Sequence, residues 1–518
     1  MTSFFIHLLP KLISKGPIFT LKNECFTQQS LKTHRIRFRH HVKIYVIALY
    51  FVAMLIQSIS GIRGTIGGVA GNGLTPPDIV RFATGYGAWV LANIASNNSS
   101  PLNAKPLVVL GRDARLSGAM VSDLVAATLN SLGIDVIDLG LSTTPTVELA
   151  VPELNADGGI ILTASHNPKQ WNALKLLDKN GEFLSAAEGE KMLMLSDSVV
   201  NYAEVDDLGS TTHDGTWIAW HIKHVLDLDL VSAESIRSAG LKIAVDAVNS
   251  SGGISIPELL EALGVEVVKI HCEPTGEFAH NPEPLPKHLH DLMNAVVEHK
   301  CDLGISVDPD VDRLCFVNED GTFFGEEYTL VAVADYVLSK TPGNTVSNLS
   351  STRALSIVTE KHGGSYTASA VGEVNVVSAI RETNAIIGGE GNGGVIYPTS
   401  HSGRDALVGV GLFLTHYVSK GLKCSELLAT YPKFVIEKDK LDLPESGVDQ
   451  ALQALIENHP EAKVNNIDGV KFDLDEGWVH LRRSNTEPII RVYAESDSAD
   501  SAKKLAGRFK AELLRLLS

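Results

Sequence analysis

The sequence predicts an α/β protein of four domains, in which three related α/β units with mixed sheets precede a smaller C-terminal α+β domain. The chain has 518 residues, which is more than a single hydrophobic core usually organises. A strand–turn–helix–strand order recurs three times, and the pattern changes to short, hairpin-like strands after Pro432. The expected domains are residues 54–205, 206–320, 321–430 and 431–518.

The three α/β units share one order of elements. In each, a short apolar run is followed by a polar turn, a helical stretch and a second apolar run. Glycine follows each helical stretch, at Gly133, Gly264 and Gly363, as is common at helix C-termini. The predicted strand, helix and strand of each unit are 107–110, 117–132 and 134–137; 241–245, 256–263 and 265–270; and 345–349, 354–362 and 365–370.

The C-terminal region is a shorter unit of about ninety residues, which lies within the usual size range of a domain. Two of its strands are separated by a turn and are predicted to form a hairpin. Its predicted elements are a strand at 434–436, a helix at 448–458, strands at 470–474, 478–481 and 489–494, and a closing helix from Ser498.

Composition narrows the functional class. Hydrophobic residues make up 44% and charged residues 20% of the chain, which is ordinary for a globular protein. The net charge of −17 argues against a general nucleic-acid binder, so an anionic substrate must meet local cations. The five cysteines are widely spaced and form no Cys-x-x-Cys pair. This predicts neither a disulfide framework nor a zinc site, and favours the reducing cytoplasm.

Residues 1–53 differ from the rest, with eight basic residues against a single acidic one, Glu24. They run into an apolar stretch at 44–56, which is short for a membrane span but suits a signal-peptide core. Cleavage after that core would fall in the glycine-containing turn at 58–64. We therefore interpret residues 1–53 as a leader outside the protein, with Met54 as its start; a targeting segment is the alternative.

Ser165 ends the apolar run 158–162, which is bounded by glycines before it and by Asn167-Pro168 after it. This pattern predicts a short buried strand and a tight turn. Ligands bind at the carboxyl edge of open α/β sheets, so a hydroxyl beside His166 and a downstream Lys175 is a candidate nucleophile. An ordinary turn serine is the alternative.

Asp308, Asp310 and Asp312 alternate along the chain and can converge on one hard cation, with Mg²⁺ favoured by the oxygen-only ligands. A calcium EF-hand loop would need glycine where Arg313 stands, and residues 314–317 are typical of a strand. A solvated acidic turn is the remaining alternative.

Residues 389–394 match the dinucleotide fingerprint G-x-G-x-x-G, but no helix is predicted after them, so a pyrophosphate site is not expected. Glu390 and Asn392 on this turn can instead bind adjacent sugar hydroxyls. A turn without a ligand is the alternative.

The densest group of phosphate-capable donors lies near the C-terminus. Guanidinium groups, hydroxyls and turn amides suit a phosphate dianion, whereas a solvated hairpin turn is the alternative. The residues are Arg482, Arg483, Ser484, Asn485, Thr486 and Arg491.

From about Ser58 to the C-terminus, these four motifs in this order resemble those of the α-D-phosphohexomutase superfamily of phosphoglucomutases, phosphomannomutases and phosphoglucosamine mutases. The resemblance implies that Ser165 carries a phosphoryl group and that the three aspartates bind one Mg²⁺ together with a phosphoserine oxygen. It places Glu390 and Asn392 on the sugar. The non-reacting phosphate would be held by Arg482, Ser484, Asn485 and Thr486, and the transferred one surrounded by Arg63, Lys175 and Arg313. His166 is expected among the catalytic residues and Arg491 among the substrate-binding ones.

The implied reaction interconverts hexose 6-phosphate and hexose 1-phosphate through a phosphoserine and a bisphosphate intermediate, with sugar 1,6-bisphosphate as activator. The partner is a small sugar phosphate, without nucleic acid or membrane, and the resemblance allows a homodimer in the cytoplasm. Two other classes compete. A serine phosphomonoesterase would not need a second phosphate clamp, and a non-catalytic sugar-phosphate sensor would tolerate loss of Ser165.

Two departures from the superfamily pattern stand out. Pro309 and Val311 occupy positions that are glycine in many relatives, which should stiffen the metal loop. Gly394 stands where many relatives have a histidine, a form similar to a branch associated with phosphoglucosamine mutase. Glucosamine 6-phosphate is therefore the expected substrate, and glucose or mannose phosphates are the alternatives. His401 is either a replacement base or, as we favour, a histidine of a surface loop.

Overall fold

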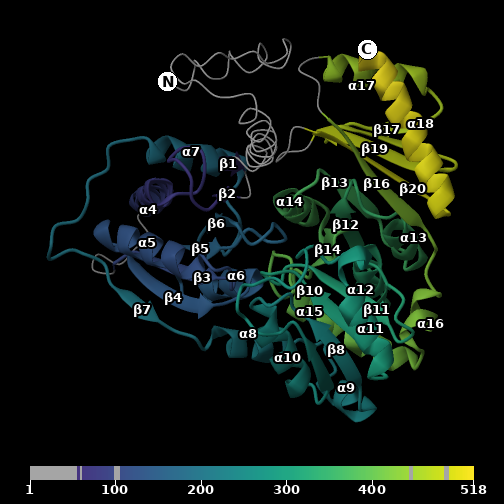
Figure 1. Cartoon of the computed structure of the whole chain (residues 1–518), viewed down its shortest axis with the longest axis horizontal. Helices are drawn as coiled ribbons and strands as arrows, with labels where there is room; N and C mark the ends of the chain where they lie inside the picture. The colour runs from purple at the N-terminus through teal and green to yellow at the C-terminus, as the bar shows by residue number, and fades with distance from the viewer. Residues whose placement is uncertain (1–54, 59–60, 98–104, 443–446, 484–488, 518) are drawn as a thin grey trace, which may run out of the picture. The chain divides into compact units, whose positions relative to one another are not determined.

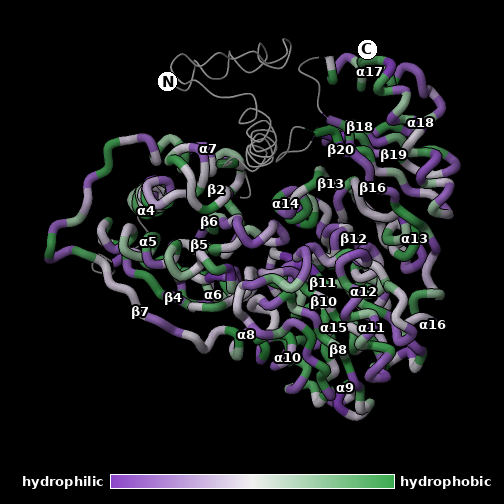
Figure 2. Tube along the Cα trace, viewed as in Figure 1, coloured by the Kyte–Doolittle hydropathy of each residue, from purple (hydrophilic) through white to green (hydrophobic). Residues whose placement is uncertain are grey.

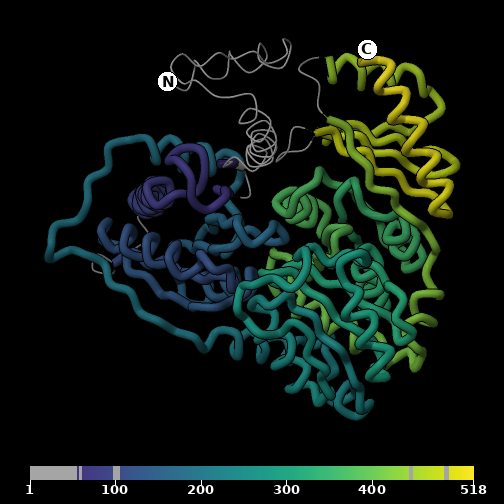
Figure 3. The backbone as a smooth tube through the Cα atoms, in the orientation of Figure 1, coloured from purple at the N-terminus to yellow at the C-terminus, as the bar shows by residue number. Residues whose placement is uncertain are grey.

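The computed structural model describes residues 55–58, 61–97, 105–442, 447–483 and 489–517 (Figure 1). The predicted leader 1–53, Met54 and the predicted phosphate ligands Ser484, Asn485 and Thr486 lie outside these residues. Figure 3 follows the backbone from the purple first part to the yellow last part. Along it the described chain forms four sheets, each built from consecutive parts of the sequence.

The first sheet is mixed and has seven strands. Its first three strands in spatial order run antiparallel to their neighbours, and the last four pair in parallel. The order is β1 (Leu55–Ser58), β2 (Gly61–Thr65), β6 (Trp171–Leu177), β5 (Gly158–Leu162), β3 (Leu107–Arg112), β4 (Asp135–Leu141) and β7 (Thr211–His213).

Helices cover both faces of this sheet because its central strands are apolar on both sides. Val108 and Leu110 pack into a core with residues of α4 (Pro76–Asn97), α5 (Gly118–Ser131) and α7 (Ala186–Ser196). Val109 between them packs into a second core with α6 (Thr144–Glu153) and α8 (Trp217–Leu226). The period-2 alternation of side chains along a strand thus places neighbouring valines in opposite cores.

The second and third sheets are both mixed and have four strands each. In both, three strands pair in parallel and the fourth is added antiparallel at one edge. The orders are β11 (Leu314–Asn318), β10 (Leu303–Val307), β8 (Lys242–Asp246), β9 (Glu266–Ile270), and β13 (Tyr366–Ser369), β12 (Asn344–Asn348), β14 (Ala385–Glu390), β15 (Gly394–Ile396).

One large core joins these two units. It contains buried residues from both sheets and from the long helix α15, including Ile305, Ile387 and Phe413. Hydrophobic residues recur along the helices and strands of the described chain (Figure 2). The helices of these units are α9 (Ala233–Ala239), α10 (Gly252–Ala262), α11 (His290–Glu298), α12 (Glu326–Lys340), α13 (Ala354–Lys361), α14 (Glu373–Thr383), α15 (Ala406–Lys420) and α16 (Cys424–Leu428).

The fourth sheet is fully antiparallel and carries two helices, α17 (Val448–Asn458) and α18 (Ala499–Leu517), with its own core around Phe472 and Phe509. This confirms the predicted fold class: three α/β units with mixed sheets and a smaller α+β unit. Its strand order is β16 (Val435–Asp442), β20 (Ile489–Ser496), β19 (Gly477–Arg483), β18 (Val470–Leu474) and β17 (Lys463–Asn465).

Candidate functional site

The four predicted motifs occupy equivalent positions, because each joins two neighbouring antiparallel strands. The pairs are β5 and β6, β10 and β11, β14 and β15, and β19 and β20. In the three α/β units the first strand of the pair also lies parallel to a central strand. Each of these three loops therefore leaves the carboxyl edge of its sheet, where open α/β sheets bind ligands.

Ser165 lies in the loop after β5 and is 3% exposed. Its backbone has φ 49°, the left-handed region that residues other than glycine adopt uncommonly and that recurs at functional sites. The Ser165 amide donates to Thr163 Oγ1 over 2.9 Å, and the Ser165 hydroxyl donates to Asp308 Oδ2 over 2.7 Å. The candidate nucleophile and the acidic loop of the second unit are thus in direct contact.

Arg115 holds the serine loop in place, and the sequence analysis did not identify it. Its guanidinium group donates to the backbone carbonyl groups of Ser165, Asn167, Pro168 and Trp171. The available signal was the polar turn that follows the strand at 107–110, since that strand neighbours β5.

Asp113 in turn orients Arg115. The Asp113 carboxylate accepts from Arg115 Nε over 2.8 Å and from Thr163 Oγ1 over 2.6 Å. Arg115 and Asp113 are 1% and 0% exposed, and a buried charge is tolerated only when it is paired and hydrogen-bonded. The Arg115–Asp113 pair therefore fixes the main chain around Ser165.

Asp308, Asp310 and Asp312 are fully buried, and one carboxylate oxygen of each lies within 4.8 Å of the others. Asp310 Oδ1 and Asp312 Oδ1 have no hydrogen-bond partner among the described residues. Unsatisfied buried carboxylate oxygens are costly, so this oxygen-only cradle fits a hard divalent cation.

Lys175 and Thr144 contact the other carboxylate oxygens, Oδ2, of Asp310 and Asp312. Lys175 Nζ lies 2.6 Å from Asp310 Oδ2 and 3.3 Å from Asp312 Oδ2, and Thr144 Oγ1 donates to Asp310 Oδ2 over 2.6 Å. Burial lowers the pKa of Lys175, but Asp310 and Asp312 raise it by more, so this pKa ends above its usual value. Lys175 is therefore a permanent cation beside the acidic loop.

The charge of Asp308 responds differently. Burial raises the pKa of Asp308 well above its usual value, and the Asp312 and Asp310 carboxylates raise it further. Three carboxylates in one buried site repel one another unless cations offset them. A cation between the three aspartates would offset both the cost of burying the Asp308 charge and the repulsion from Asp312 and Asp310.

Val311 lies at the tip of the acidic loop and adopts φ 64° while fully buried. A β-branched residue in the left-handed region is a strained exception. The prediction that this loop is stiff has a structural basis here, since a valine has fewer backbone alternatives than a glycine.

Three of the predicted site residues, Arg63, His166 and Arg313, lie near Ser165 or the acidic loop. Arg63 Nη1 donates to Asn167 Oδ1 over 2.8 Å, and His166 Nδ1 lies 3.4 Å from Ser165 Oγ. Arg313 Nε lies 3.9 Å from Asp308 and finds no hydrogen-bond partner among the described residues. Burial lowers the pKa of Arg63 to about 10, so this group stays cationic near pH 7.

Glu390 is the last residue of β14, and its carboxylate accepts from four donors. Asn348 Nδ2 and the Gly372 amide donate to Oε1 over 2.9 and 3.1 Å. Arg404 Nη1 and Asn392 Nδ2 donate to Oε2 over 3.0 and 3.3 Å. A carboxylate has about four lone-pair sites, so Glu390 is saturated by protein donors. As expected, a strand and not a helix follows the loop after β14.

Arg404 is the second residue that the sequence analysis passed over. Its Nη2 lies 2.6 Å from Asp312 Oδ2, its Nη1 3.0 Å from Glu390 Oε2, and its Nε 3.0 Å from Glu373 Oε2. Burial lowers the pKa of Arg404, but these three carboxylates raise it by more. No local sequence signal marks Arg404, because its partners come from three other segments.

His401 lies close to this group but faces other carboxylates. Its side chain is 11% exposed, with Nε2 3.1 Å from Asp405 Oδ2 and Nδ1 3.4 Å from Glu148 Oε2. The favoured interpretation of a surface-loop histidine therefore understates its burial. Asp405 also caps α15 by accepting from the amides of Leu407 and Val408.

In the fourth unit, Arg482 on β19 lies opposite Arg491 on β20. Arg482 Nε is buried without a hydrogen-bond partner among the described residues. Arg483 points elsewhere, since its Nη2 lies 2.9 Å from Asp449 Oδ1. Two of the predicted arginines thus share one end of a hairpin, while the turn between them lies outside the described residues.

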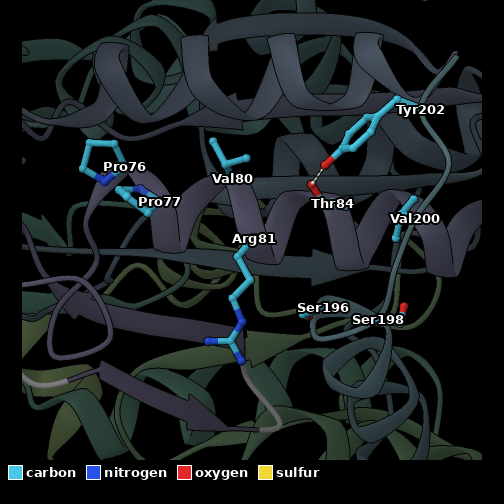
Figure 4. A pocket seen from close by; sticks show the side chains of 9 residues that line it. All are labelled: Pro76, Pro77, Val80, Arg81, Thr84, Ser196, Ser198, Val200 and Tyr202. Atoms are coloured by element: carbon cyan, nitrogen blue, oxygen red, sulfur yellow. Dashed lines mark hydrogen bonds between the residues drawn. The ribbon is translucent and has the colours of Figure 1, made fainter. Parts of the chain in front are cut away.

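A hollow of about 530 Å³ opens elsewhere, between α4 and the segment after α7 (Figure 4). Tyr202 and Thr84 meet across it through their hydroxyl groups, 3.4 Å apart. Arg81, the cation on its wall, is paired with Asp197. This hollow contains none of the predicted site residues.

Among the described residues, no helix is both long enough and apolar enough to cross a membrane.

Comparison with known protein families matches four consecutive domains of one family. The matches are Phosphoglucomutase/phosphomannomutase alpha/beta/alpha domain I over residues 55–197, domain II over 219–321, domain III over 325–434 and the C-terminal domain over 440–512.

Individual relatives agree. The chain is 32% identical to a probable phosphoglucosamine mutase of Methanopyrus kandleri, over 87% of this chain and 96% of that protein. It is 34% identical to a phosphoglucomutase/phosphomannomutase of Thermococcus kodakarensis, over 85% and 96%. A crystal structure of a phosphoglucomutase/phosphomannomutase family protein from Burkholderia thailandensis is 26% identical, covers 89% of this chain and 98% of its own, and has a TM-score of 0.75. The chain belongs to the phosphoglucomutase/phosphomannomutase family and is a phosphohexomutase, an isomerase that relocates a phosphoryl group on a hexose.

Proposed function

We propose that this phosphohexomutase interconverts glucosamine 6-phosphate and glucosamine 1-phosphate through a phosphoserine at Ser165 and a glucosamine 1,6-bisphosphate intermediate. One observation carries the serine assignment: the Ser165 hydroxyl lies 2.7 Å from Asp308 Oδ2 in a buried left-handed turn. A hydroxyl fixed beside a carboxylate and near several cations suits a nucleophile that accepts and returns a phosphoryl group.

Asp308, Asp310 and Asp312 would hold Mg²⁺, because two of their oxygens are buried and find no hydrogen-bond partner in the described parts of the chain. When bound, Mg²⁺ offsets negative charge on the oxygens of the transferred phosphoryl group. A related N-acetylphosphoglucosamine mutase from Aspergillus fumigatus has been crystallised with GlcNAc-6P and magnesium. That protein is 16% identical to this chain, so the proposal rests on the aspartates themselves.

In the first half-reaction, the bond between phosphorus and Ser165 Oγ breaks as a free sugar hydroxyl bonds to phosphorus. The proton that the sugar hydroxyl gives up is matched by the proton that Ser165 Oγ gains, so the half-reaction neither takes up nor releases a proton overall. Asp308 Oδ2, 2.7 Å from Ser165 Oγ, accepts a hydrogen bond from the restored serine hydroxyl. Lys175, Arg63 and Arg313 supply positive charge around the phosphoryl oxygens. After the bisphosphate turns end for end, Ser165 takes the other phosphoryl group and releases the product.

Glu390 and Asn392 would bind the sugar hydroxyls, while Arg482, Ser484, Asn485, Thr486 and Arg491 would hold the phosphate that is not reacting. Because four protein donors already reach Glu390, a sugar hydroxyl must displace one of them. Asn392 Nδ2 has the longest of the four bonds, at 3.3 Å, and is the donor expected to give way.

The glucosamine assignment draws on the glycine at 394 and on the Methanopyrus kandleri relative. Glucose or mannose 6-phosphate is the second candidate, because the Thermococcus kodakarensis relative, named for those two sugars, is 34% identical. Sugar 1,6-bisphosphate is the proposed activator, since it can phosphorylate Ser165 directly. The proposed location is the cytoplasm, in agreement with the four described cysteines being unpaired.

The test compares glucosamine, glucose and mannose 6-phosphates, each with and without the matching 1,6-bisphosphate and with Mg²⁺ or a chelator. We expect the highest kcat/KM for glucosamine 6-phosphate, activation by bisphosphate and loss of turnover in chelator. Intact-mass measurement should find one phosphoryl group on wild type and none on Ser165→Ala, whose turnover should fall by several orders of magnitude. Normal turnover by Ser165→Ala would exclude the phosphoserine route, and higher kcat/KM for glucose or mannose phosphate would replace the substrate.

A further inference from the structure

We propose that Arg404 is the positioning residue that ties the acidic loop (residues 308–313) to the sugar loop (residues 389–394), and that Gly394 provides the space that the Arg404 side chain needs. The inference rests on the proposed metal and sugar sites. In this inference the Arg404 side chain occupies the space that a side chain at position 394 would otherwise fill.

The first observation is steric. A Cβ atom on Gly394 would overlap Cδ of Arg404 and lie 3.0 Å from its Cγ. Gly394 lies in β15 and does not adopt a positive φ, so its backbone accepts any residue. Space for Arg404 is therefore the reason for glycine here, and any side chain at 394 requires Arg404 to take another path.

The second observation is the three-way pairing of the guanidinium group. Each of its three nitrogens faces a different carboxylate: Asp312 in the acidic loop, Glu390 in the sugar loop and Glu373 at the start of α14. The side chain is 9% exposed. A planar fork can serve three acceptors at once, whereas a lysine ammonium on a flexible stem cannot reproduce that geometry.

Two consequences follow for the site. Arg404 and Lys175 both face Asp312 Oδ2, at 2.6 and 3.3 Å, so Asp312 Oδ1 is the oxygen left for a cation. Arg404 also fixes Glu390 Oε2, so that the sugar hydroxyl replaces Asn392 and meets a carboxylate already in place. Arg404 thereby lowers the affinity for the cation and raises the affinity for the sugar.

The test measures these opposite effects separately, with Mg²⁺ affinity from calorimetry on sugar-free protein and KM from steady-state kinetics. In Arg404→Met, Mg²⁺ should bind about tenfold more tightly, because Asp312 loses a competing cation, while KM for the hexose phosphate should rise at least tenfold. Arg404→Lys keeps the charge but loses the fork, so we expect Mg²⁺ affinity within about threefold of wild type and a KM raised about tenfold. A residue that only stabilised the fold would not tighten Mg²⁺ binding.

Gly394→Ala should reproduce the raised KM by displacing Arg404. The displacement is tested in a protein that already carries Arg404→Ala together with Glu373→Gln, which removes one carboxylate that would otherwise be left unpaired. Adding Gly394→Ala to that protein should raise KM less than twofold, because no Arg404 side chain remains to be displaced. Gly189→Ala, where an added Cβ meets nothing within 4 Å, and Arg381→Met, whose side chain is 55% exposed, are the matched controls.

Wild-type KM in both Arg404→Lys and Gly394→Ala would overturn the inference. Weaker Mg²⁺ binding by a folded Arg404→Met variant would also overturn it. Circular dichroism checks that this variant folds, and if it does not, the double variant Arg404→Met with Glu373→Gln takes its place. These outcomes differ from failure of the proposed function, in which the wild type itself would show no Mg²⁺ binding or no mutase turnover.

Discussion

Arg115 donates hydrogen bonds to four backbone carbonyl groups of the serine loop, yet its local signal, the polar turn after the strand at 107–110, does not by itself distinguish it from a solvated arginine. Ser165 itself was predictable, because a buried strand followed by a polar turn is a local pattern. The carbonyl partners of Arg115 lie fifty or more residues further along the chain, and the carboxylate partners of Arg404 lie in three other segments. Local pattern therefore locates the candidate reactive groups but not the residues that contact and orient them.

Replacing Arg115 by lysine should weaken catalysis more than it weakens the fold. A lysine cannot reach four carbonyl groups and Asp113 together, and lost charge-assisted hydrogen bonds cost about 1.5–3 kcal/mol each. We expect kcat/KM to fall at least a hundredfold and Ser165 to take up phosphate more slowly from bisphosphate. Steady-state kinetics and phosphoserine mass measurements provide the check, with Arg112→Lys at the end of β3 as control. Equal losses in both variants would contradict a specific role for Arg115.

At the scale of elements, the strands that end at the site were predictable because they are short apolar runs with turn residues after them. Several helices were not predicted. In α12, ten consecutive residues from Thr329 to Leu338 are buried, and in α15 twelve consecutive residues from Ala406 to Tyr417 are buried. A helix that is buried on all sides lacks the periodic alternation from which a helix is recognised in sequence.

β19 carries a buried histidine that should make stability depend on pH. His480 Nδ1 lies 2.9 Å from Ser350 Oγ and Nε2 lies 2.6 Å from the Asp468 carbonyl. Burial lowers the pKa of His480 to about 4, against about 6.5 in an unfolded chain. The unfolded state therefore binds the proton at higher pH, and stability is lost as pH falls from about 6.5 to 4.

The slope attributable to His480 approaches 1.4 kcal/mol per pH unit in that window. Urea unfolding of wild type and His480→Gln between pH 4 and 7.5 measures it. We expect the loss of unfolding free energy toward low pH to be smaller in His480→Gln. His213→Gln, at a side chain that is 77% exposed, should follow the wild type, and identical slopes in all three proteins would refute the assignment.

At the scale of the whole molecule, the proposed reaction needs groups from all four units. Ser165 follows a strand of the first sheet and the aspartates follow a strand of the second, whereas Glu390 ends a strand of the third and Arg482 lies in a strand of the fourth. The second and third units share one core, which the sequence did not indicate because each unit showed the same complete pattern. Chain order predicted the units, whereas their packing depends on contacts between distant segments.

Arg482→Ala should separate phosphoryl transfer from hydrolysis. Arg482 is proposed to grip the phosphate that is not reacting, so its binding energy positions the distant hydroxyl. Losing a charge-assisted fork worth about 1.5–3 kcal/mol should lower kcat/KM about tenfold to a hundredfold and increase release of bisphosphate or inorganic phosphate. Both products are measured alongside mutase turnover. Arg483→Ala, which removes a pair with Asp449, is the neighbouring control, and an unchanged mutase rate in Arg482→Ala would reject the clamp.

A chain that begins at Met54 should fold and keep full activity. The family match starts at residue 55, and β1 starts at Leu55, so residues 1–53 are expected to contribute nothing to the phosphohexomutase. Thermal unfolding and turnover of the shortened chain are compared with those of the full chain. A Tm lowered by several degrees, or reduced turnover, would show that residues 1–53 belong to the working enzyme.

Because each motif bridges two adjacent antiparallel strands, its two ends are anchored side by side and a replacement loop can close on the same anchors. Substrate redesign by loop exchange is therefore open to this enzyme without altering the order of strands in any sheet. The exception lies at β15, where the loop shares its space with Arg404. A donor loop that ends in histidine must be transplanted together with a smaller residue at 404, so positions 391–394 and 404 form one exchangeable unit.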